Sequence, residues 1–159
     1  MKAVVCVDLN WGIGYRGKLL ARIPEDMRLF RRLTLGKTVI MGRGTFESLP
    51  APLEARVNIV LSRSLNANAV LVCRSLDELF LRLEAYPADD VFVIGGEAIY
   101  SQLLPHCTQA YVTEIAARFD ADRHFADLNQ DESWVLRGKS DYKTHHDLRY
   151  RFLEYFHNG

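Results

Sequence analysis

Three glycine-rich turns, each placed directly after an apolar, strand-like run, constrain the fold of this chain more than any other feature. They lie in the segments AVVCVDLNWGIGYRG (3–17), TVIMGRGTF (38–46) and DVFVIGGEAIY (90–100). A strand that ends in glycines and enters a helix presents backbone N–H groups to an anion, and the helix dipole favours its binding. The three turns together predict one extended, phosphate-bearing ligand that is held at several strand ends.

Apolar runs alternate with helical patterns, which is typical of an α/β domain with a largely parallel sheet. We expect strands at 3–7, 38–41, 57–61, 69–73, 91–94 and 110–115. We expect helices at 25–35, 76–86 and 97–104. The segments 134–140 and 148–157 alternate apolar and polar residues, which predicts an antiparallel hairpin at one sheet edge.

The composition is typical of one globular domain. The chain has 159 residues, enough to bury a sizeable core, and no linker or repeat divides 1–159. Lys and Arg together number 20, as do Asp and Glu, so the formal net charge is zero. Binding to nucleic acid or to a membrane surface generally needs a basic excess, so we expect neither. No apolar run has the length of a membrane span, and residues 1–9 are too short and too acidic for a signal peptide, so we expect neither feature.

The three cysteines, Cys6, Cys73 and Cys107, are far apart and form no CxxC or metal-ligand spacing. An odd number of distant cysteines favours reduced thiols over a disulfide framework. Reduced thiols are typical of the cytoplasm, where we expect this protein, without a metal ion.

Residues 12–17, GIGYRG, match the dinucleotide-binding pattern G-x-G-x-x-G, but their context contradicts it. A Rossmann unit needs a helix at this point and an acidic residue at the next strand end. Pro24 interrupts any such helix, and the later stretch LTLGK has no carboxylate. The sequence therefore predicts a long, glycine-hinged loop over 9–24. Such a loop is either a lid over a bound ligand or a mobile surface loop.

Asp26 lies on the apolar stripe of the helix expected after Pro24. It precedes Leu29, Phe30 and Leu33 by three, four and seven residues, so it faces the core side. One interpretation is a first-turn carboxylate that complements the helix dipole. The other is a partly buried carboxyl group with a raised pKa, which can bind a ligand or help to protonate it. The neighbouring glycine turns favour the second interpretation.

These residues together resemble the dihydrofolate reductases of bacteria. The matching segments are NWGIG (10–14), IPEDMRLF (23–30), VIMGRGTFESLP (39–50), RVNIVLSRS (56–64), VFVIGGEAIY (91–100), YVTEI (111–115) and HFAD (124–127). The final hairpin matches too, so the resemblance covers essentially the whole chain. The patterns VIMGR-x-T-x-ES and VIGG-x-x-x-Y, in this order and spacing, are highly specific.

The resemblance implies one domain with a twisted, mostly parallel eight-stranded sheet, flanking helices and an antiparallel C-terminal edge hairpin. It implies NADPH-dependent reduction of 7,8-dihydrofolate to 5,6,7,8-tetrahydrofolate, by hydride transfer to C6 and protonation at N5, in support of one-carbon metabolism. Asp26 matches the family's one ionisable residue in the pterin pocket. There its carboxylate binds the 2-amino group and N3 and supports protonation of N5. A monomer that also binds antifolate-type small molecules is expected.

The resemblance assigns residues to each ligand. Those matching the substrate site are Val4, Cys6, Met27, Phe30, Arg31, Leu49, Leu53, Arg56, Ile94 and Thr113. Those matching the cofactor site are Cys6, Ile13, Gly14, Leu19, Arg43, Gly44, Thr45, Ser62, Arg63, Gly95, Gly96, Glu97, Ala98, Ile99 and Tyr100. For the apolar residues of the substrate pocket, each considered alone, a plain core position is the better default interpretation.

Several of these positions have a definite implied role. Thr113 matches the residue that hydrogen-bonds Asp26, and Gly95 and Gly96 match a pair joined by a cis peptide. Arg56 matches the arginine that binds the glutamate α-carboxylate of folate, although an arginine at a strand start is also typical of a plain surface residue.

Three further segments match parts of the family's cofactor site. The turn 43–45 matches a second phosphate turn, and 62–63 matches the site of the adenosine 2′-phosphate. Residues 13–19 match the mobile loop over the nicotinamide.

The chain departs from the family pattern after this loop. Leu20 and Ala21 stand where most members carry a Pro-Trp pair, whose indole anchors a water near the pterin. Activity is expected without that indole. Ala121 and Asp122 match a remote loop that braces the lid in some relatives.

Two other functions share parts of this pattern. A reductase of riboflavin biosynthesis has the same fold and uses NADPH, but it acts on a ribosylated pyrimidine. A nucleotide-binding module would keep the glycine turns and perform no chemistry. Asp26 together with Arg56 favours folate over the ribosylated pyrimidine, and dihydrofolate-dependent loss of NADPH absorbance would separate all three functions.

Overall fold

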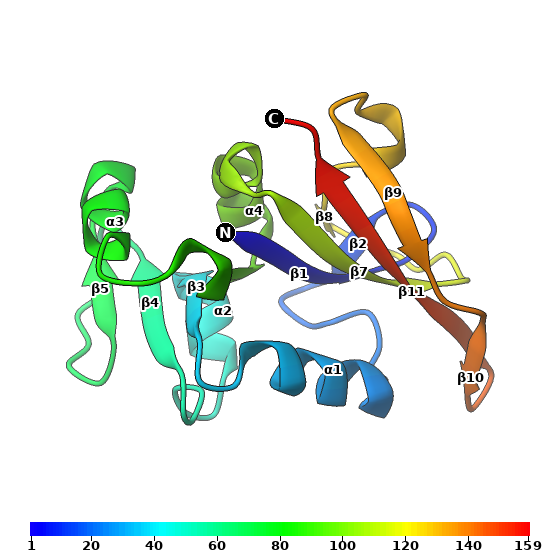
Figure 1. Cartoon of the computed structure of the whole chain (residues 1–159). Helices are drawn as coiled ribbons and strands as arrows, with labels where there is room; N and C mark the ends of the chain where they lie inside the picture. The colour runs from blue at the N-terminus through cyan, green and yellow to red at the C-terminus, as the bar shows by residue number, and fades with distance from the viewer.

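The fold is built on one strongly twisted sheet, and the computed structural model describes residues 1–159. Eight strands lie in the order β10-β11-β7-β1-β6-β3-β4-β5, and a ninth, β9, pairs with β11. The pairs from β7 to β5 are parallel, whereas β11 runs antiparallel to β7. Figure 1 shows how far the strand direction turns between β5 and β11. The chain therefore begins in the middle of the sheet, at β1.

The strands are β1 (Lys2–Val7), β2 (Gly12–Gly14), β3 (Thr38–Gly42), β4 (Val57–Leu61), β5 (Leu71–Cys73), β6 (Val91–Gly95), β7 (Gln109–Ile115), β8 (Arg123–His124), β9 (Trp134–Lys139), β10 (Lys143–His145) and β11 (Leu148–His157). The α-helices are α1 (Pro24–Thr34), α2 (Arg43–Ser48), α3 (Leu76–Leu83) and α4 (Glu97–Leu103). Short 3₁₀ turns lie at Ala88–Asp90, Leu104–His106 and Leu128–Gln130. None of the helices is both long and apolar enough to cross a membrane.

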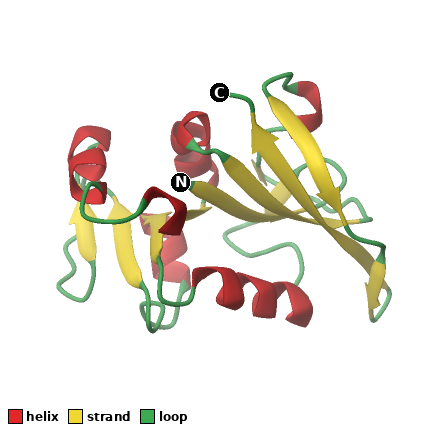
Figure 2. Ribbon diagram, viewed as in Figure 1, coloured by secondary structure: helices red, strands yellow, loops and turns green.

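Helices cover both faces of the sheet, because successive side chains of each buried strand point to opposite sides. Ala3, Val5 and Val7 of β1 pack in one core with residues of α3 and α4. Val4 packs in a second core, on the other face, with residues of α1 and α2. Figure 2 shows the resulting arrangement of helices around the strands.

The expected α/β domain is confirmed, with the predicted antiparallel edge. Eight strands lie side by side, as expected, and the outer position beside β11 is shared by two short strands. β10 pairs with residues 148–150 of β11, and β9 pairs with residues 153–157. The polar segment 141–147, expected to be only a connection, therefore contains a strand of its own.

The prediction of one uninterrupted loop over 9–24 is wrong at residues 12–14. Gly12–Gly14 form β2, which pairs antiparallel with β8 in a separate two-stranded sheet. A strand of three residues has no periodic pattern of its own, and its partner is remote in the sequence. Helix α2 was missed as well, since its six residues RGTFES carry no apolar stripe.

Candidate functional site

Asp26 and Thr113 form the polar centre of the predicted substrate site. Asp26 lies in the first turn of α1, which Pro24 starts at a position that suits proline. Thr113 lies on β7, directly opposite Cys6 of β1. Its hydroxyl Oγ1 donates a hydrogen bond of 2.6 Å to Asp26 Oδ1. This is the contact that the family resemblance predicts, and it joins two residues that are remote in the sequence.

Burial controls the ionisation of this centre. Desolvation raises the pKa of the Asp26 carboxyl, and the hydrogen bond from Thr113 opposes that rise. Burial, with a smaller effect of Asp26, also raises the pKa of the Cys6 thiol far above its usual range. The thiol therefore stays neutral. Asp26 is left as a carboxyl group that holds its proton more tightly than an exposed one, as proton-transfer chemistry requires.

The predicted apolar wall of the substrate site is assembled on the α1 face of the sheet. Val4, Leu49, Leu53 and Ile94 are all half-buried and pack against one core cluster. Phe30 is half-buried as well. Met27 differs, because 49% of its surface is exposed. A side chain this open at the first turn of α1 is available to a ligand rather than part of the core.

Arg56 is fixed at the far end of α1. Its Nε donates to the Glu54 carbonyl oxygen at 2.8 Å, and Nη1 donates to Thr34 Oγ1 at 3.1 Å. Burial lowers the pKa of Arg56, and the nearby Arg31 guanidinium lowers it further. None of the five ion pairs of the structure includes either arginine. The Glu54 carboxylate raises this pKa, but only as the smallest of these effects. Two neighbouring guanidinium groups that form no internal ion pair can bind an external carboxylate.

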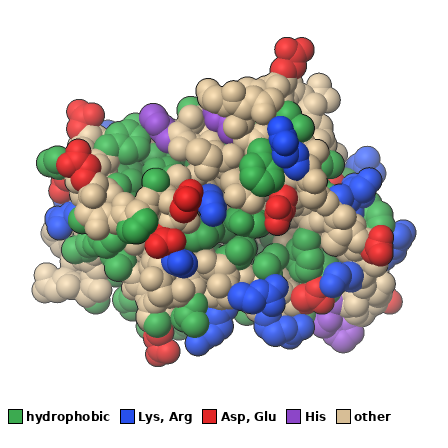
Figure 3. Space-filling model, viewed as in Figure 1, with side chains coloured by type: hydrophobic (Ala, Val, Ile, Leu, Met, Phe, Trp, Pro, Cys, Tyr) green, Lys and Arg blue, Asp and Glu red, His purple; other side chains and the backbone are tan.

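Arginines of α1 contribute to this positive surface. Figure 3 shows Lys and Arg side chains gathered along the lower edge of the molecule, over α1. Arg28, Arg31 and Arg32 are all exposed there. A chain with zero net charge thus has a local positive field at this end of the site.

Asn58 is a positioning residue that sequence reasoning missed. It is 8% exposed, and its Oδ1 accepts a hydrogen bond from the Leu53 N–H at 2.9 Å. Its Nδ2 donates to the carbonyl oxygens of Leu53 and Arg56. The side chain therefore closes the turn that carries two predicted substrate residues. The signal was present, since Asn58 is the one polar residue within the apolar run 57–61.

The two glycine turns at 42–45 and 95–96 lie against each other. The peptide bond between Gly95 and Gly96 is cis, as the resemblance predicts. A Cβ on Gly95 or Gly96 would lie 3.5 or 3.6 Å from Thr45 Oγ1. On Gly42, a Cβ would meet Ile99 Cγ1 of α4 at 2.8 Å. Glycine at position 42 therefore lets the end of β3 approach the start of α4 closely, which brings together the two turns that are predicted to bind the diphosphate.

Tyr100 links these turns to the centre of the sheet. The tyrosine is 6% exposed, and its hydroxyl donates a hydrogen bond of 2.6 Å to the Val4 carbonyl oxygen. Burial raises the pKa of its hydroxyl far above its usual range, and the Asp26 carboxylate adds to the rise. Tyr100 is therefore a neutral, rigid ring between the predicted phosphate and pterin sites.

The predicted 2′-phosphate residues gather at the ends of β3 and β4. Arg43 follows β3, and its Nη1 donates to Ser64 Oγ at 2.8 Å. Ser62 follows β4, and its Oγ accepts hydrogen bonds from the N–H groups of Ser64 and Leu65. Its hydroxyl hydrogen remains available to a ligand. Arg63 is exposed and forms none of the ion pairs of the structure.

Arg74 belongs to the same cluster, and sequence reasoning missed it. It follows β5, the parallel neighbour of β4. Its Nη1 donates to the Ser62 carbonyl oxygen at 3.1 Å, and Nη2 donates to Asn66 Oδ1 at 3.3 Å. Because the carboxyl ends of parallel strands lie at one edge of a sheet, the position of Arg74 directly after a strand was the available signal.

The predicted lid, residues 13–19, is held by the loop that precedes β8. The Gly14 carbonyl oxygen accepts a hydrogen bond from the Asp122 N–H at 3.0 Å. In return, Asp122 Oδ2 accepts one from the Arg16 N–H, also at 3.0 Å. Ile13 is half-buried, whereas 65% of the Leu19 surface is exposed. The bracing that the resemblance suggests for Asp122 is thus present.

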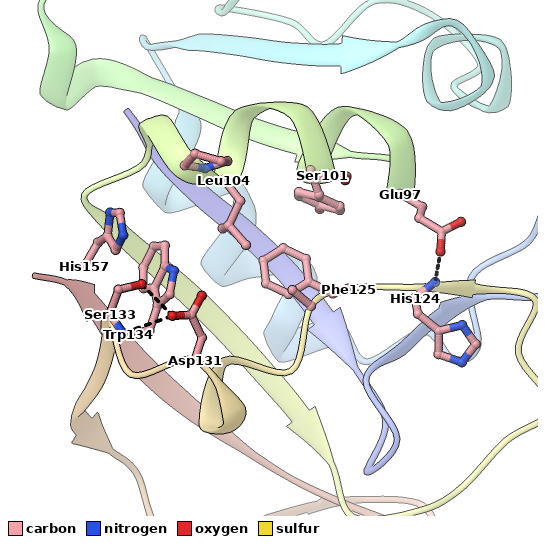
Figure 4. A pocket seen from close by; sticks show the side chains of 12 residues that line it. Glu97, Ser101, Leu104, His124, Phe125, Asp131, Ser133, Trp134 and His157 are labelled. Atoms are coloured by element: carbon pink, nitrogen blue, oxygen red, sulfur yellow. Dashed lines mark hydrogen bonds between the residues drawn. The ribbon is translucent and has the colours of Figure 1, made fainter. Parts of the chain in front are cut away.

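A hollow of about 510 Å³ lies beside α4, and its lining includes Glu97 and Tyr100 of the predicted cofactor set (Figure 4). Its acidic side chains are already engaged within the chain. Glu97 Oε1 accepts a hydrogen bond from the His124 N–H, and Asp131 Oδ1 accepts two from Ser133. No group of three or more His, Cys, Asp or Glu side chains could hold a metal ion here or elsewhere.

Comparison with known proteins identifies similar chains. The model of the dihydrofolate reductase family matches residues 1–157. A dihydrofolate reductase of Haemophilus influenzae is 35% identical over 154 residues, covering 94% of this chain and 95% of that protein. One of Bacillus subtilis is 35% identical over 158 residues, covering 96% of this chain and 91% of that protein.

A solved structure has the same fold. Dihydrofolate reductase from Enterococcus faecalis, in complex with NADP(H) and a compound called RAB-propyl, superposes with a TM-score of 0.88. The two chains are 29% identical, and the superposition covers 99% of this chain and 96% of the other.

The raised pKa of Asp26 predicts that Asp26→Asn stabilises the protein at neutral pH. The folded state binds the Asp26 proton more tightly than the unfolded state does. The free energy of unfolding therefore falls as pH rises from the unfolded pKa, about 3.9, to the folded pKa, and stays lower above it. Asparagine has no charge to desolvate. Urea denaturation should show the variant more stable at pH 8, with little difference near pH 3.

Asp131→Asn is the matched control, because hydrogen bonds from Ser133 lower the pKa of this exposed carboxyl. This substitution should lower stability at pH 8 instead of raising it. If Asp26→Asn also destabilised the protein at pH 8, the ionised carboxylate would be favoured by its site, contrary to the desolvation argument.

Proposed function

The chain belongs to the dihydrofolate reductase family and reduces dihydrofolate with NADPH, and from this premise we propose how its residues divide the work. NADPH supplies the hydride, so the protein's own task is to bind, orient, exclude water and place a proton. Asp26 binds the 2-amino group and N3 of the pterin and supports protonation at N5. The observation that carries this proposal is the half-buried carboxyl group of Asp26, which accepts one hydrogen bond, from Thr113.

The local chemistry supports this role. Only Oδ1 of Asp26 is engaged by Thr113, so Oδ2 remains free to accept from a ligand. The neighbouring ionisable groups, Cys6 and Tyr100, both stay neutral because burial raises their pKa values. Asp26 is thus left as the acid–base group at this place, and burial raises its pKa above the usual value of a carboxyl group.

Asp26→Asn should keep the fold and lose most activity at pH 7–8, because the amide retains the shape without the ionisable proton. Part of the loss should be recovered in acid, where dihydrofolate in solution is itself protonated. Steady-state rates from pH 5 to 9 measure this, with Asp131→Asn as the control that leaves activity unchanged. Full activity of Asp26→Asn at pH 7–8 would remove Asp26 from the protonation step.

The substrate's glutamate is proposed to bind at Arg56, with Arg31 beside it. Support comes from the two guanidinium groups that form no internal ion pair and from Asn58, which fixes the turn before Arg56. Phe30, Met27, Leu49 and Leu53 would surround the ring system that joins pterin and glutamate.

Arg56→Leu should raise KM for dihydrofolate far more than it changes kcat, because the glutamate carboxylate binds alike in the ground and transition states. A pterin substrate without the glutamate should barely distinguish the variant from the parent enzyme. If both enzymes preferred full-length dihydrofolate to the same degree, Arg56 would be a structural residue only.

The cofactor is proposed to lie along the carboxyl ends of β6, β3, β4 and β5. The diphosphate would meet Gly95, Gly96 and the start of α4 on one side and Arg43 to Thr45 on the other. The 2′-phosphate would meet Arg43, Ser62 and Arg63, and the structure adds Arg74 to this set. The close fit of the two glycine turns and the free cation of Arg63 support this placement.

The enzyme should prefer NADPH to NADH by at least about tenfold, since each charged hydrogen bond lost costs roughly 1.5–3 kcal/mol. Replacing Arg43 and Arg63 together by Ala should weaken NADPH binding and leave NADH binding nearly unchanged. Arg74→Ala, added to these two substitutions, should reduce the preference for NADPH over NADH further. Arg82→Ala, on the exposed side of α3, is the control. A double variant that kept its preference would show that the 2′-phosphate site lies elsewhere.

A monomer in the cytoplasm is the proposed state of the enzyme. The free thiols of Cys6, Cys73 and Cys107 favour a reducing compartment. The exposed large apolar side chains, such as Leu81 on α3 and Leu136 on β9, come from separate elements rather than one patch. Light scattering at micromolar concentration tests the mass, and a dimer would contradict the proposal.

A further inference from the structure

We propose that Asp8 is a positioning residue that fixes the base of the lid, by joining the segment that leads into it to the loop that holds it closed. Asp8 directly follows β1 and is 1% exposed. None of the five ion pairs of the structure includes it. A carboxylate buried without a cation needs other donors, and these donors identify its role.

Backbone N–H groups of two separate segments supply the donors. Asp8 Oδ1 accepts hydrogen bonds from the N–H groups of Asn10 at 2.9 Å and Gly12 at 2.8 Å. Oδ2 accepts one from the Phe119 N–H at 2.9 Å. One oxygen thus binds the turn that leads into the lid, and the other binds the loop 116–122.

Backbone hydrogen bonds around Asp8 hold the same two segments together. The Leu9 N–H donates to the Ala117 carbonyl oxygen at 3.0 Å, and the Asp8 N–H donates to that of Gly12 at 3.1 Å. A Cβ on Gly12 would lie 2.7 Å from the Ala121 Cβ and 3.1 Å from Asp8 Oδ1. Gly12 therefore allows both segments to approach the carboxylate.

The lid is held only a few residues farther along the same two segments. Gly14 and Arg16 on the lid side bind Asp122 on the loop side. Gly12 precedes Gly14 by two residues, and Phe119 precedes Asp122 by three. Because both segments are fixed to the Asp8 carboxylate, Asp122 is held at the position where it can bond to Gly14 and Arg16. Without this carboxylate, each segment could shift and the contacts of Asp122 would open.

Asp8→Asn tests this geometry with almost no change in size. Asparagine has one acceptor oxygen, and its NH₂ group would face an N–H donor on one of the two segments. In either orientation of the amide, the substitution therefore removes a hydrogen bond to one of the two segments that Asp8 joins. We expect the lid to open more often, without a matching loss of global stability.

Trypsin can measure lid opening directly, because Arg16 and Lys18 are exposed residues of the lid. Native-state proteolysis reports the population of locally open forms when reclosing is fast. In the enzyme without added ligand, Asp8→Asn should increase the rate of cleavage after Arg16 and Lys18 at least about tenfold, as loss of a hydrogen bond to a charged group predicts. Mass spectrometry of the fragments identifies the sites.

Ser75→Ala is the matched control for global stability. Ser75 Oγ accepts the Glu78 N–H at the start of α3, remote from the lid. This variant should lose stability in urea but be cleaved in the lid at the parental rate. Equal acceleration in both variants, or no acceleration in Asp8→Asn, would overturn the proposal.

Asp122→Ala tests whether the two carboxylates act on the same contact. It should also accelerate lid cleavage, and the Asp8→Asn/Asp122→Ala double variant should be cleaved no faster than the more sensitive single variant. Multiplied effects in the double variant would mean that the two residues hold the lid independently, which would contradict the proposal.

Hydrogen exchange of the unmodified enzyme tests the proposal without any substitution. The amide hydrogens of Gly12 and Phe119 should be more protected from exchange than that of Asp122. The hydrogen bond of the Asp122 amide should therefore open first, and those of Gly12 and Phe119 should open later. Rapid exchange at Gly12 and Phe119 while Asp122 stays protected would show that the lid contact does not depend on Asp8.

Discussion

Strand β1 pairs in parallel with β7 on one side and β6 on the other, and this pairing positions most of the other elements. β1 aligns with β7 from Lys2↔Gln109 to Val7↔Glu114, and with β6 through Lys2 and Ala3. Successive side chains of β1 point to opposite faces of the sheet. Ala3, Val5 and Val7 therefore lie in the core under α3 and α4, and Val4 lies in the core under α1 and α2. Cys6, on the latter side, faces Asp26. The same strand therefore supports both cores, the substrate site and, where it ends, the lid.

Buried Asp8 and half-buried Asp26, both near β1, differ in role because they accept different numbers of hydrogen bonds. Asp8 accepts three backbone hydrogen bonds, which use its charge to hold two segments together. Asp26 accepts one, from Thr113, so burial raises its pKa and an oxygen remains free. The desolvation that lowers stability at Asp26 is what keeps a proton available there. At Asp26, function and stability are thus opposed, whereas at Asp8 they are aligned.

Residues with a local signal were predicted well from the sequence. The glycine turns, the position of Asp26 on a helix stripe and most strands depend on patterns within a few neighbouring residues. Arg74, Asn58 and the β2–β8 pair were missed, because their roles depend on partners elsewhere in the fold. Arg74 matters only once β5 lies beside β4 and carries it to Ser62.

Local patterns in the sequence are enough to predict the alternation of strands and helices and the glycines that permit close approach. The zero net charge also indicates that phosphate binding depends on local groups. Which distant groups meet depends on the folded structure: Thr113 with Asp26, Asp8 with Phe119, and Asp122 with Arg16. The reason is physical. Backbone propensity and hydrophobic period act over a few residues, whereas a hydrogen bond between separated segments and the burial that shifts a pKa exist only after the sheet has brought those segments together.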